Sequence, residues 1–212
     1  MFETTWDGSV AVVELDHGKV NAVGRAQLEA LDLLCTALEE GQARALVTWS
    51  KKVSSRGTPI FVAGADVTER LGWTEAQVLD HVAFQRGVLT RVRRLPLFHI
   101  TVVHGVALGW GTEFLITADY RLATPSASFA LPETGLGIVP GAGGTSELWS
   151  VIGLPQAMRL AMTGERIDAA EALRIGLIQE VLADVHVGLD RALELAHRVA
   201  RRRPTSAQDR HR

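Results

Sequence analysis

The sequence predicts a single domain with an α/β fold, and three observations support this prediction. Short apolar runs rich in β-branched residues alternate along the chain with longer segments in which apolar residues recur at helical spacing. A length of 212 residues and a hydrophobic content of 47% suit one domain with a sizeable buried core. The chain contains no internal repeat and no low-complexity linker that would divide it.

In the first half of the chain, expected strands alternate with two long helices. The segment RAQLEALDLLCTALEE (25–40) repeats leucines at helical spacing, which predicts an amphipathic helix. A longer helix is expected over residues 74–94, and the polar segment SKKVSSRGTP (50–59) is expected to be an exposed loop. The expected strands are VAVVEL (10–15), RALVTW (44–49), IFVAGADV up to its glycine (60–64) and PLFHITVVHG (96–105).

The second half is expected to be mostly helical. A helix begins at the glycines of GWG (109–111) and reaches about residue 118. Three further helices each end at a glycine, as helix C-termini commonly do: TSELWSVIG (145–153), LPQAMRLAMTG (154–164) and DAAEALRIG (168–176). The remaining expected elements are short strands within YRLATPSASFA (120–130), a strand at LIQEVL (177–182) and a last helix over residues 186–203.

Charge and cysteine content limit the class of protein. A formal net charge of -2 gives no reason to expect a nucleic acid or another polyanion as partner. The N-terminus lacks the layout of a signal peptide, and no apolar run reaches the roughly 18 residues that span a bilayer. The single cysteine, Cys35, cannot form an intrachain disulfide, which fits a reducing compartment. We therefore expect a soluble, cytoplasmic protein with no membrane contact.

Two glycine-containing junctions each follow an expected strand and precede an expected helix start. They are VAGADV, around Gly64, and LGWGTE, around Gly109. A helix start leaves backbone N–H groups without intrahelical partners, and two convergent N–H groups can stabilise a carbonyl oxygen that gains negative charge. Such glycines can also serve only to permit tight turns. Two junctions of this kind beside a pair of acids favour a functional site.

Two glutamates lie in a mostly apolar segment. Glu113 falls in the first turn of an expected helix, and Glu133 follows Pro132 between two apolar runs. Carboxyl groups in apolar surroundings have raised pKa values, which suits acid–base catalysis near neutral pH. Glu113 could instead only complement the helix dipole, and sequence spacing does not show that the two side chains meet. The histidines are scattered and show no metal-ligand spacing.

Four segments carry a resemblance to a known family: KVNAV (19–23), FVAGADV (61–67), VHGVALGWGTEFLITADYRLA (103–123) and FALPETGLGIVPGAGGTSEL (129–148). The segment MTGERIDAAEALRIGLIQEV (162–181) extends it, so that the resemblance covers roughly residues 8–182. In this order and spacing the segments resemble the crotonase, or enoyl-CoA hydratase/isomerase, superfamily.

The resemblance implies a crotonase-like ββα spiral fold with a shortened C-terminal helical region. It implies a crotonase-like core over residues 1–183 and a truncated C-terminal helical segment over residues 184–212, where relatives continue for several more helices. It also implies a homotrimer or hexamer in fatty acid metabolism. Coenzyme A enters as part of the substrate, and no separate cofactor and no metal are expected.

The resemblance further implies which residues form the site. Glu113 and Glu133 match the two catalytic glutamates of the hydratases, and the backbone N–H groups of Ala65 and Trp110 match the oxyanion hole. The family commonly has glycine where this chain has Trp110, and we expect the indole to narrow or reshape the acyl pocket. The residues expected to bind the substrate and CoA are Val20, Ala22, Ala63, Gly64, Asp66, Val67, Thr68 and Gly109.

Because both glutamate positions are filled, we expect a hydro-lyase that adds water to, or removes it from, the 2,3 double bond of an acyl-CoA thioester. One alternative is another crotonase reaction: enoyl-CoA isomerisation, decarboxylation, or dehydration of a thioester on an acyl carrier protein. A second alternative is a non-catalytic acyl-CoA-binding or scaffold protein.

Overall fold

The computed structural model describes residues 2–202, and residues 1 and 203–212 lie outside the described part of the chain. The expected C-terminal segment 184–212 is therefore described only as far as residue 202. The strands are β1 (Phe2–Asp7), β2 (Val10–Leu15), β3 (Ala45–Trp49), β4 (Ile60–Val62), β5 (Phe98–Val103), β6 (Val106–Leu108), β7 (Tyr120–Ala123), β8 (Ser128–Ala130), β9 (Ile167–Asp168) and β10 (Glu180–Val181). The helices are α1 (Arg25–Glu40), α2 (Glu75–Arg94), α3 (Trp110–Leu115), α4 (Leu148–Ile152), α5 (Leu154–Thr163), α6 (Ala169–Arg174) and α7 (Val185–Arg202), with 3-10 helices η1 (Val67–Arg70) and η2 (Pro132–Leu136).

Two sheets organise the described residues. The larger sheet has six strands in the order β1-β2-β3-β5-β7-β10, and the smaller has four in the order β4-β6-β8-β9. From β3 to β8, successive strands alternate between the two sheets, and α2, α3 and η2 follow β4, β6 and β8 in turn. This repeated strand–strand–helix unit confirms the expected α/β class and the crotonase-like spiral.

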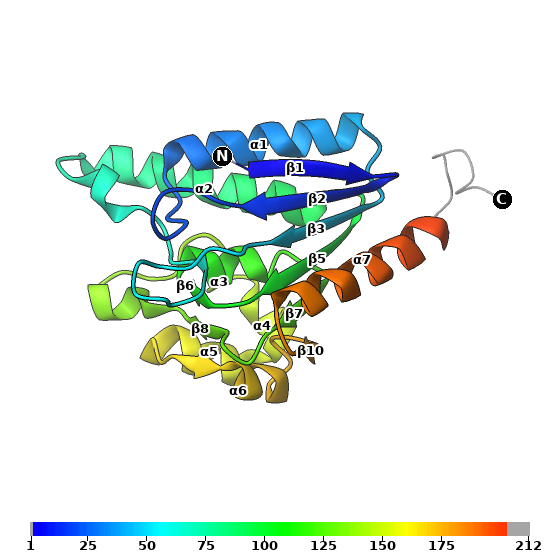
Figure 1. Cartoon of the computed structure of the whole chain (residues 1–212). Helices are drawn as coiled ribbons and strands as arrows, with labels where there is room; N and C mark the ends of the chain where they lie inside the picture. Colours follow the sequence, from blue (N-terminus) through cyan, green and yellow to red (C-terminus); the bar gives the residue numbers. More distant parts are fainter. Residues whose placement is uncertain (1, 203–212) are drawn as a thin grey trace.

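The larger sheet is covered on both faces because its strands are apolar on both sides (Figure 1). On one face, Ala11 and Leu46 belong to the same core as the buried side of α1. On the other face, Val10 and Val47 pack with α7. Three alanines of this helix are small enough to lie against the strands: Ala192, Ala196 and Ala200. Side chains alternate in direction along a strand, so one sequence supplies both cores.

The helix α1 begins and ends as its leucine pattern predicts. Its buried residues are Leu28, Leu31, Cys35 and Leu38, which lie on one side of the helix. Burial among these apolar side chains raises the pKa of the Cys35 thiol to about 12. This cysteine is therefore part of the apolar core.

Some elements differ from the expectation. The sequence does not predict β1 or β9, and it gives no bounds for the strand that ends before Gly109, which is β6. β1 is largely exposed, and β6 and β9 have only three and two residues. The helix expected over residues 145–153 is limited to α4, because residues 141–147 form turns. Of the strand expected at 177–182, only β10 forms; Leu177 and Ile178 are buried in the core instead.

Candidate active site

The candidate site lies where three neighbouring strands of the smaller sheet end. β4 pairs with β6 and β6 pairs with β8, and both pairs are parallel. The carboxyl ends of these strands therefore lie at the same edge of the sheet. Each of the three segments singled out in the sequence leaves the sheet there: the junction at Gly64, the junction at Gly109, and the start of η2 with Glu133.

The first junction presents the backbone N–H of Ala65. Gly64 has a φ of +120°, which favours glycine, and a Cβ built on it would lie 3.4 Å from the carbonyl oxygen of Leu108, at the end of the neighbouring strand. The amides around Ala65 are paired: Val23 donates to Gly64 (3.0 Å) and Asp66 donates to Val23 (2.9 Å). The N–H of Ala65 itself has no acceptor among the described residues.

The second junction presents the backbone N–H of Trp110. Gly109 has a φ of +52°, and Trp110 is the first residue of α3, where an N–H has no intrahelical acceptor. Within residues 2–202 the N–H of Trp110 has no backbone acceptor, whereas the N–H of Glu113 donates to the carbonyl oxygen of Gly109 (3.0 Å). A Cβ on Gly111 would lie 2.4 Å from the carbonyl oxygen of Val62, so α3 packs directly on the end of β4. This close packing brings the two available N–H groups to adjacent strand ends.

Glu113 is held by the loop between η2 and α4. Its side chain is buried, and its Oε1 accepts hydrogen bonds from the backbone N–H groups of Ala142 (2.8 Å) and Gly144 (2.9 Å). Burial raises the pKa of Glu113, and these N–H groups oppose the increase because they stabilise the carboxylate. A glutamate that only complemented a helix dipole would not need this second support.

Glu133 lies in the first turn of η2, and its side chain has fewer hydrogen bonds than that of Glu113. Its Oε2 is buried and has no hydrogen-bond partner in the described part of the chain. Burial raises the pKa of Glu133 to about 7, and the nearby Glu113 carboxylate adds to this increase. A Cβ on Gly109 would lie 2.5 Å from Oε1 of Glu133, so the carboxyl group rests against the backbone of the second junction.

The structure therefore brings the four predicted residues together. The charges of Glu113 and Glu133 influence each other, and Glu133 contacts the turn that presents the N–H of Trp110. The first junction, with Ala65, lies at the neighbouring strand end. Two carboxyl groups with different surroundings, beside two backbone donors, can move protons next to a carbonyl group. Their catalytic roles stay predictions.

The residues expected to contact CoA lie on two adjacent segments. The loop at residues 19–23 runs beside residues 63–66: the N–H of Ala63 donates to Val20 (3.2 Å), and Val23 and Ala65 form an isolated bridge. Asp66 caps η1 by accepting the N–H of Thr68 at 3.0 Å. These segments contain Val20, Ala22, Ala63, Gly64, Asp66, Val67 and Thr68, and Gly109 lies at the next strand end.

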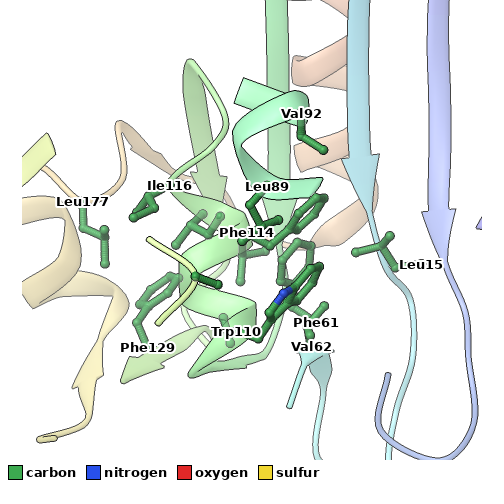
Figure 2. Packing of buried hydrophobic residues seen from close by; sticks show 14 of the residues in the cluster. Leu15, Phe61, Val62, Leu89, Val92, Trp110, Phe114, Ile116, Phe129 and Leu177 are labelled. Atoms are coloured by element: carbon green, nitrogen blue, oxygen red, sulfur yellow. The ribbon is translucent and has the colours of Figure 1, made fainter. Parts of the chain in front are cut away.

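The indole of Trp110 packs in the core beside Phe114 and Val62 (Figure 2). It stacks on Phe114 with ring centroids 5.3 Å apart and an interplanar angle of 6°. It lines a cavity of about 320 Å³ together with Val62 and residues of the β2–α1 region. Neither catalytic candidate, Glu113 nor Glu133, lines this cavity. The indole therefore shapes this cavity, and its expected effect on the acyl pocket stays a prediction.

The sequence does not predict that the amides of Ala142 and Gly144 are part of the site. The available signal is the glycine-dense GAGG stretch, which forms turns over Glu113. A Cβ on Gly144 would lie 2.5 Å from the side chain of Pro140 and 3.3 Å from Oε1 of Glu113. The absence of a side chain at this position therefore lets the loop approach the carboxylate.

A buried histidine contacts the loop at residues 50–59. His104 is buried, and its Nε2 lies 2.9 Å from the carbonyl oxygen of Lys52. Among the described residues, no group of three or more histidine, cysteine, aspartate or glutamate side chains could hold a metal ion. Across the same part of the chain, every helix is too short or too polar to cross a membrane.

Comparisons with known proteins agree with the fold. The family model for enoyl-CoA hydratase/isomerase matches residues 5–210. The chain is 32% identical to a short-chain-enoyl-CoA hydratase of Clostridium acetobutylicum, over 95% of this chain and 76% of that protein. A crystal structure of an enoyl-CoA hydratase from Bacillus anthracis superposes with a TM-score of 0.85 at 36% identity, covering 94% of this chain and 76% of that one. The structure of Pseudomonas aeruginosa DspI superposes with a TM-score of 0.87 at 31% identity, covering 96% and 81%.

Proposed function

The chain belongs to the enoyl-CoA hydratase/isomerase family, and within this family we propose that it is a hydratase. The reaction adds water to, or removes it from, the 2,3 double bond of an acyl-CoA thioester. The observation that carries this proposal is the pair of carboxyl groups of buried Glu113 and half-buried Glu133, which interact with each other beside the turn at Gly109. A hydration needs two proton transfers, and two neighbouring carboxyl groups can supply both.

In this proposal the thioester carbonyl oxygen binds the N–H groups of Ala65 and Trp110. Attack of water at C3 places negative charge on this oxygen as an enolate forms. Two backbone donors stabilise that charge, and they need no reorganisation because the turns at Gly64 and Gly109 already present them.

The surroundings of the two glutamates suggest different roles. Glu113, held by two N–H groups, is the base that takes a proton from water as the hydroxyl oxygen bonds to C3. Glu133, with a pKa of about 7, is partly protonated at neutral pH and gives its proton to C2. Each turnover leaves one proton more on Glu113 and one fewer on Glu133, and transfer between them restores the site. All atoms of water enter the product, so the reaction requires no redox cofactor.

The CoA portion is proposed to lie along the segments at residues 19–23 and 63–68. Backbone pairing between them forms one continuous strip that leads from the Ala65 amide towards the exposed residues of η1. Coenzyme A would be held as part of the substrate, with no separate cofactor.

The test is the loss of the enoyl thioester absorbance when the purified chain is mixed with crotonyl-CoA. Glu113→Gln and Glu133→Gln should each abolish this loss, whereas Glu75→Gln, an exposed glutamate of α2, should not. Activity that survives both site substitutions would refute the hydratase assignment. A wild-type chain that only interconverts 2- and 3-enoyl thioesters would be an isomerase, and one that binds acyl-CoA without turnover would be a scaffold.

We also propose that the protein works as a homotrimer or hexamer in the cytoplasm, in fatty acid metabolism. Support for assembly comes from apolar side chains exposed on α4 and α5, including Trp149 and Met158. The reducing conditions of the cytoplasm suit a chain whose single cysteine is unpaired.

A further inference from the structure

A cavity of about 320 Å³ lies behind the two proposed oxyanion donors. Its floor is buried and mostly apolar, formed by Leu15, Val62, Trp110 and Phe114. The indole Nε1 of Trp110 is buried and has no hydrogen-bond partner among the described residues. Its mouth is at the exposed end of the β2–α1 region, where Asp16 and its neighbours reach solvent. The lining includes neither glutamate, so the proton transfers of the proposed reaction do not take place in this cavity, although Ala22 and Val23 also belong to the proposed CoA strip.

The cavity is nevertheless connected to the amides. Val23 lines it and pairs with Ala65, while Val62 lines it and ends the strand that precedes Ala65. Trp110 contributes its indole to the wall and its N–H to the proposed oxyanion hole. A molecule in the cavity would therefore touch the residues that hold both donors in place.

The chemistry of the lining indicates what fits. A cavity of about 150 Å³ with apolar walls stays dry and accommodates benzene, so this one has room for roughly twice that ligand. At the mouth, the carboxylate of Asp16 is paired with Lys52, so the negative charge is largely balanced. Nδ1 of His17 and Nε2 of Gln27 are 3.5 Å apart, too far for a good hydrogen bond, and can pair with a polar group of a ligand.

We propose that this cavity is a binding site for a small molecule with an apolar body and one uncharged hydrogen-bonding end, such as a medium-chain alcohol. The body lies on the indole of Trp110, and the hydroxyl group lies at the mouth between His17 and Gln27. The site adjoins the proposed CoA strip, because Asn21, Ala22 and Val23 belong to both, but its occupancy does not depend on the proposed reaction.

The test is a calorimetric titration of the purified chain with 1-octanol, together with the indole N–H resonance of Trp110, assigned by Trp110→Phe. Binding should release heat that saturates and should shift this resonance. Ala30→Leu places a larger side chain in the cavity and should weaken binding by roughly tenfold or more. The matched control Ala37→Leu makes the same change at an exposed position of the same helix outside the cavity, and should bind as the wild type does.

Three results would overturn the proposal: no saturable heat, a Trp110 resonance that does not move, or equal binding by the wild type and Ala30→Leu. If Ala30→Leu does not fold, Ala26→Leu at the mouth makes the same comparison. Octanoate should bind more weakly than 1-octanol, because its carboxylate would lose part of its hydration at the mouth of the cavity. Binding as tight as that of the alcohol would contradict an uncharged end.

Discussion

Glu113 and Glu133 are chemically identical residues that differ because of what surrounds them. Two backbone N–H groups hold the carboxylate of Glu113, whereas one oxygen of Glu133 is buried without a partner. Burial raises both pKa values. Backbone N–H groups of the loop at residues 142–144 oppose the increase at Glu113, whereas only its own backbone N–H opposes it at Glu133. The assignment of base and acid depends on this difference.

The acid role of Glu133 predicts a pH dependence of the reaction. Only the protonated form can give a proton to C2, and its pKa is about 7. The kcat/KM for hydration of crotonyl-CoA should therefore fall as pH rises above about 7, by roughly tenfold for each further pH unit. Measured rates between pH 5.5 and pH 9 check this. A rate that instead rises through pH 7 would reverse the two roles.

The same carboxyl group predicts a pH dependence of stability. Its pKa rises from 4.5 to about 7 on folding, so the folded state binds more protons in this range and the free energy of unfolding falls as pH rises through it. Glu133→Gln removes this loss. At pH 8 the variant should be more stable by roughly 1 kcal/mol, after discounting for partial exposure, and at pH 4 the two should be equal. Denaturant unfolding at both pH values measures this, with Glu75→Gln as the control. A variant that is less stable at pH 8 would contradict it.

For these residues, the sequence predicts which ones form the site better than it predicts what surrounds each of them. The motif positions indicate Glu113, Glu133 and the two junctions, and the structure brings them together. Sequence patterns could not reveal that Ala142 and Gly144 hold Glu113, because this contact joins segments far apart in the chain. The direction of the Trp110 side chain was equally hidden, since it depends on the stacking with Phe114.

At the scale of elements, the contact between α3 and the end of β4 positions the two donors. Gly111→Ala would place a Cβ 2.4 Å from the carbonyl oxygen of Val62 and push the helix off the strand. We expect a loss of roughly 2 kcal/mol in unfolding free energy and at least a tenfold loss of kcat, because the Trp110 N–H moves with the helix.

Gly87→Ala is the matched control for that substitution. Gly87 is exposed on α2, and a Cβ there would meet nothing within 4 Å. This variant should gain roughly 0.5–1 kcal/mol because alanine favours a helix, with unchanged activity. Chemical denaturation and the crotonyl-CoA assay measure both variants. Equal behaviour of the two variants would show that the α3–β4 contact does not matter.

The elements differ in how well the sequence predicts them. α1 and α2 are long and amphipathic, and their boundaries follow the pattern closely. β6 and β9 have only three and two residues, too few for a periodic signal. Residues 141–147 form turns because the loop folds over Glu113, a constraint that is absent from the local sequence.

At the scale of the whole molecule, one apolar surface has no cover within the described residues. Leu154, Met158 and Met162 recur every four residues along α5 and are 61%, 52% and 64% exposed, with Trp149 of α4 nearby in sequence. Such a row of exposed apolar side chains is typical of an interface between subunits.

This surface predicts the effect of a substitution on assembly. Met158→Glu should convert a trimer or hexamer into monomers, because burying a carboxylate at the interface is unfavourable. Light scattering after size-exclusion chromatography measures the mass of each species. Leu33→Glu, which changes an exposed leucine of α1, should leave the assembly intact. Wild-type chains that are monomeric would refute the proposed assembly.

The environment of Cys35 has a practical consequence. The chain has no other thiol, and this one is buried and protonated well above physiological pH. Alkylating reagents and maleimide dyes should leave the native protein unmodified. A cysteine introduced at any chosen surface position would then be the sole point of attachment, so spectroscopic labels could be placed one at a time without first redesigning the background.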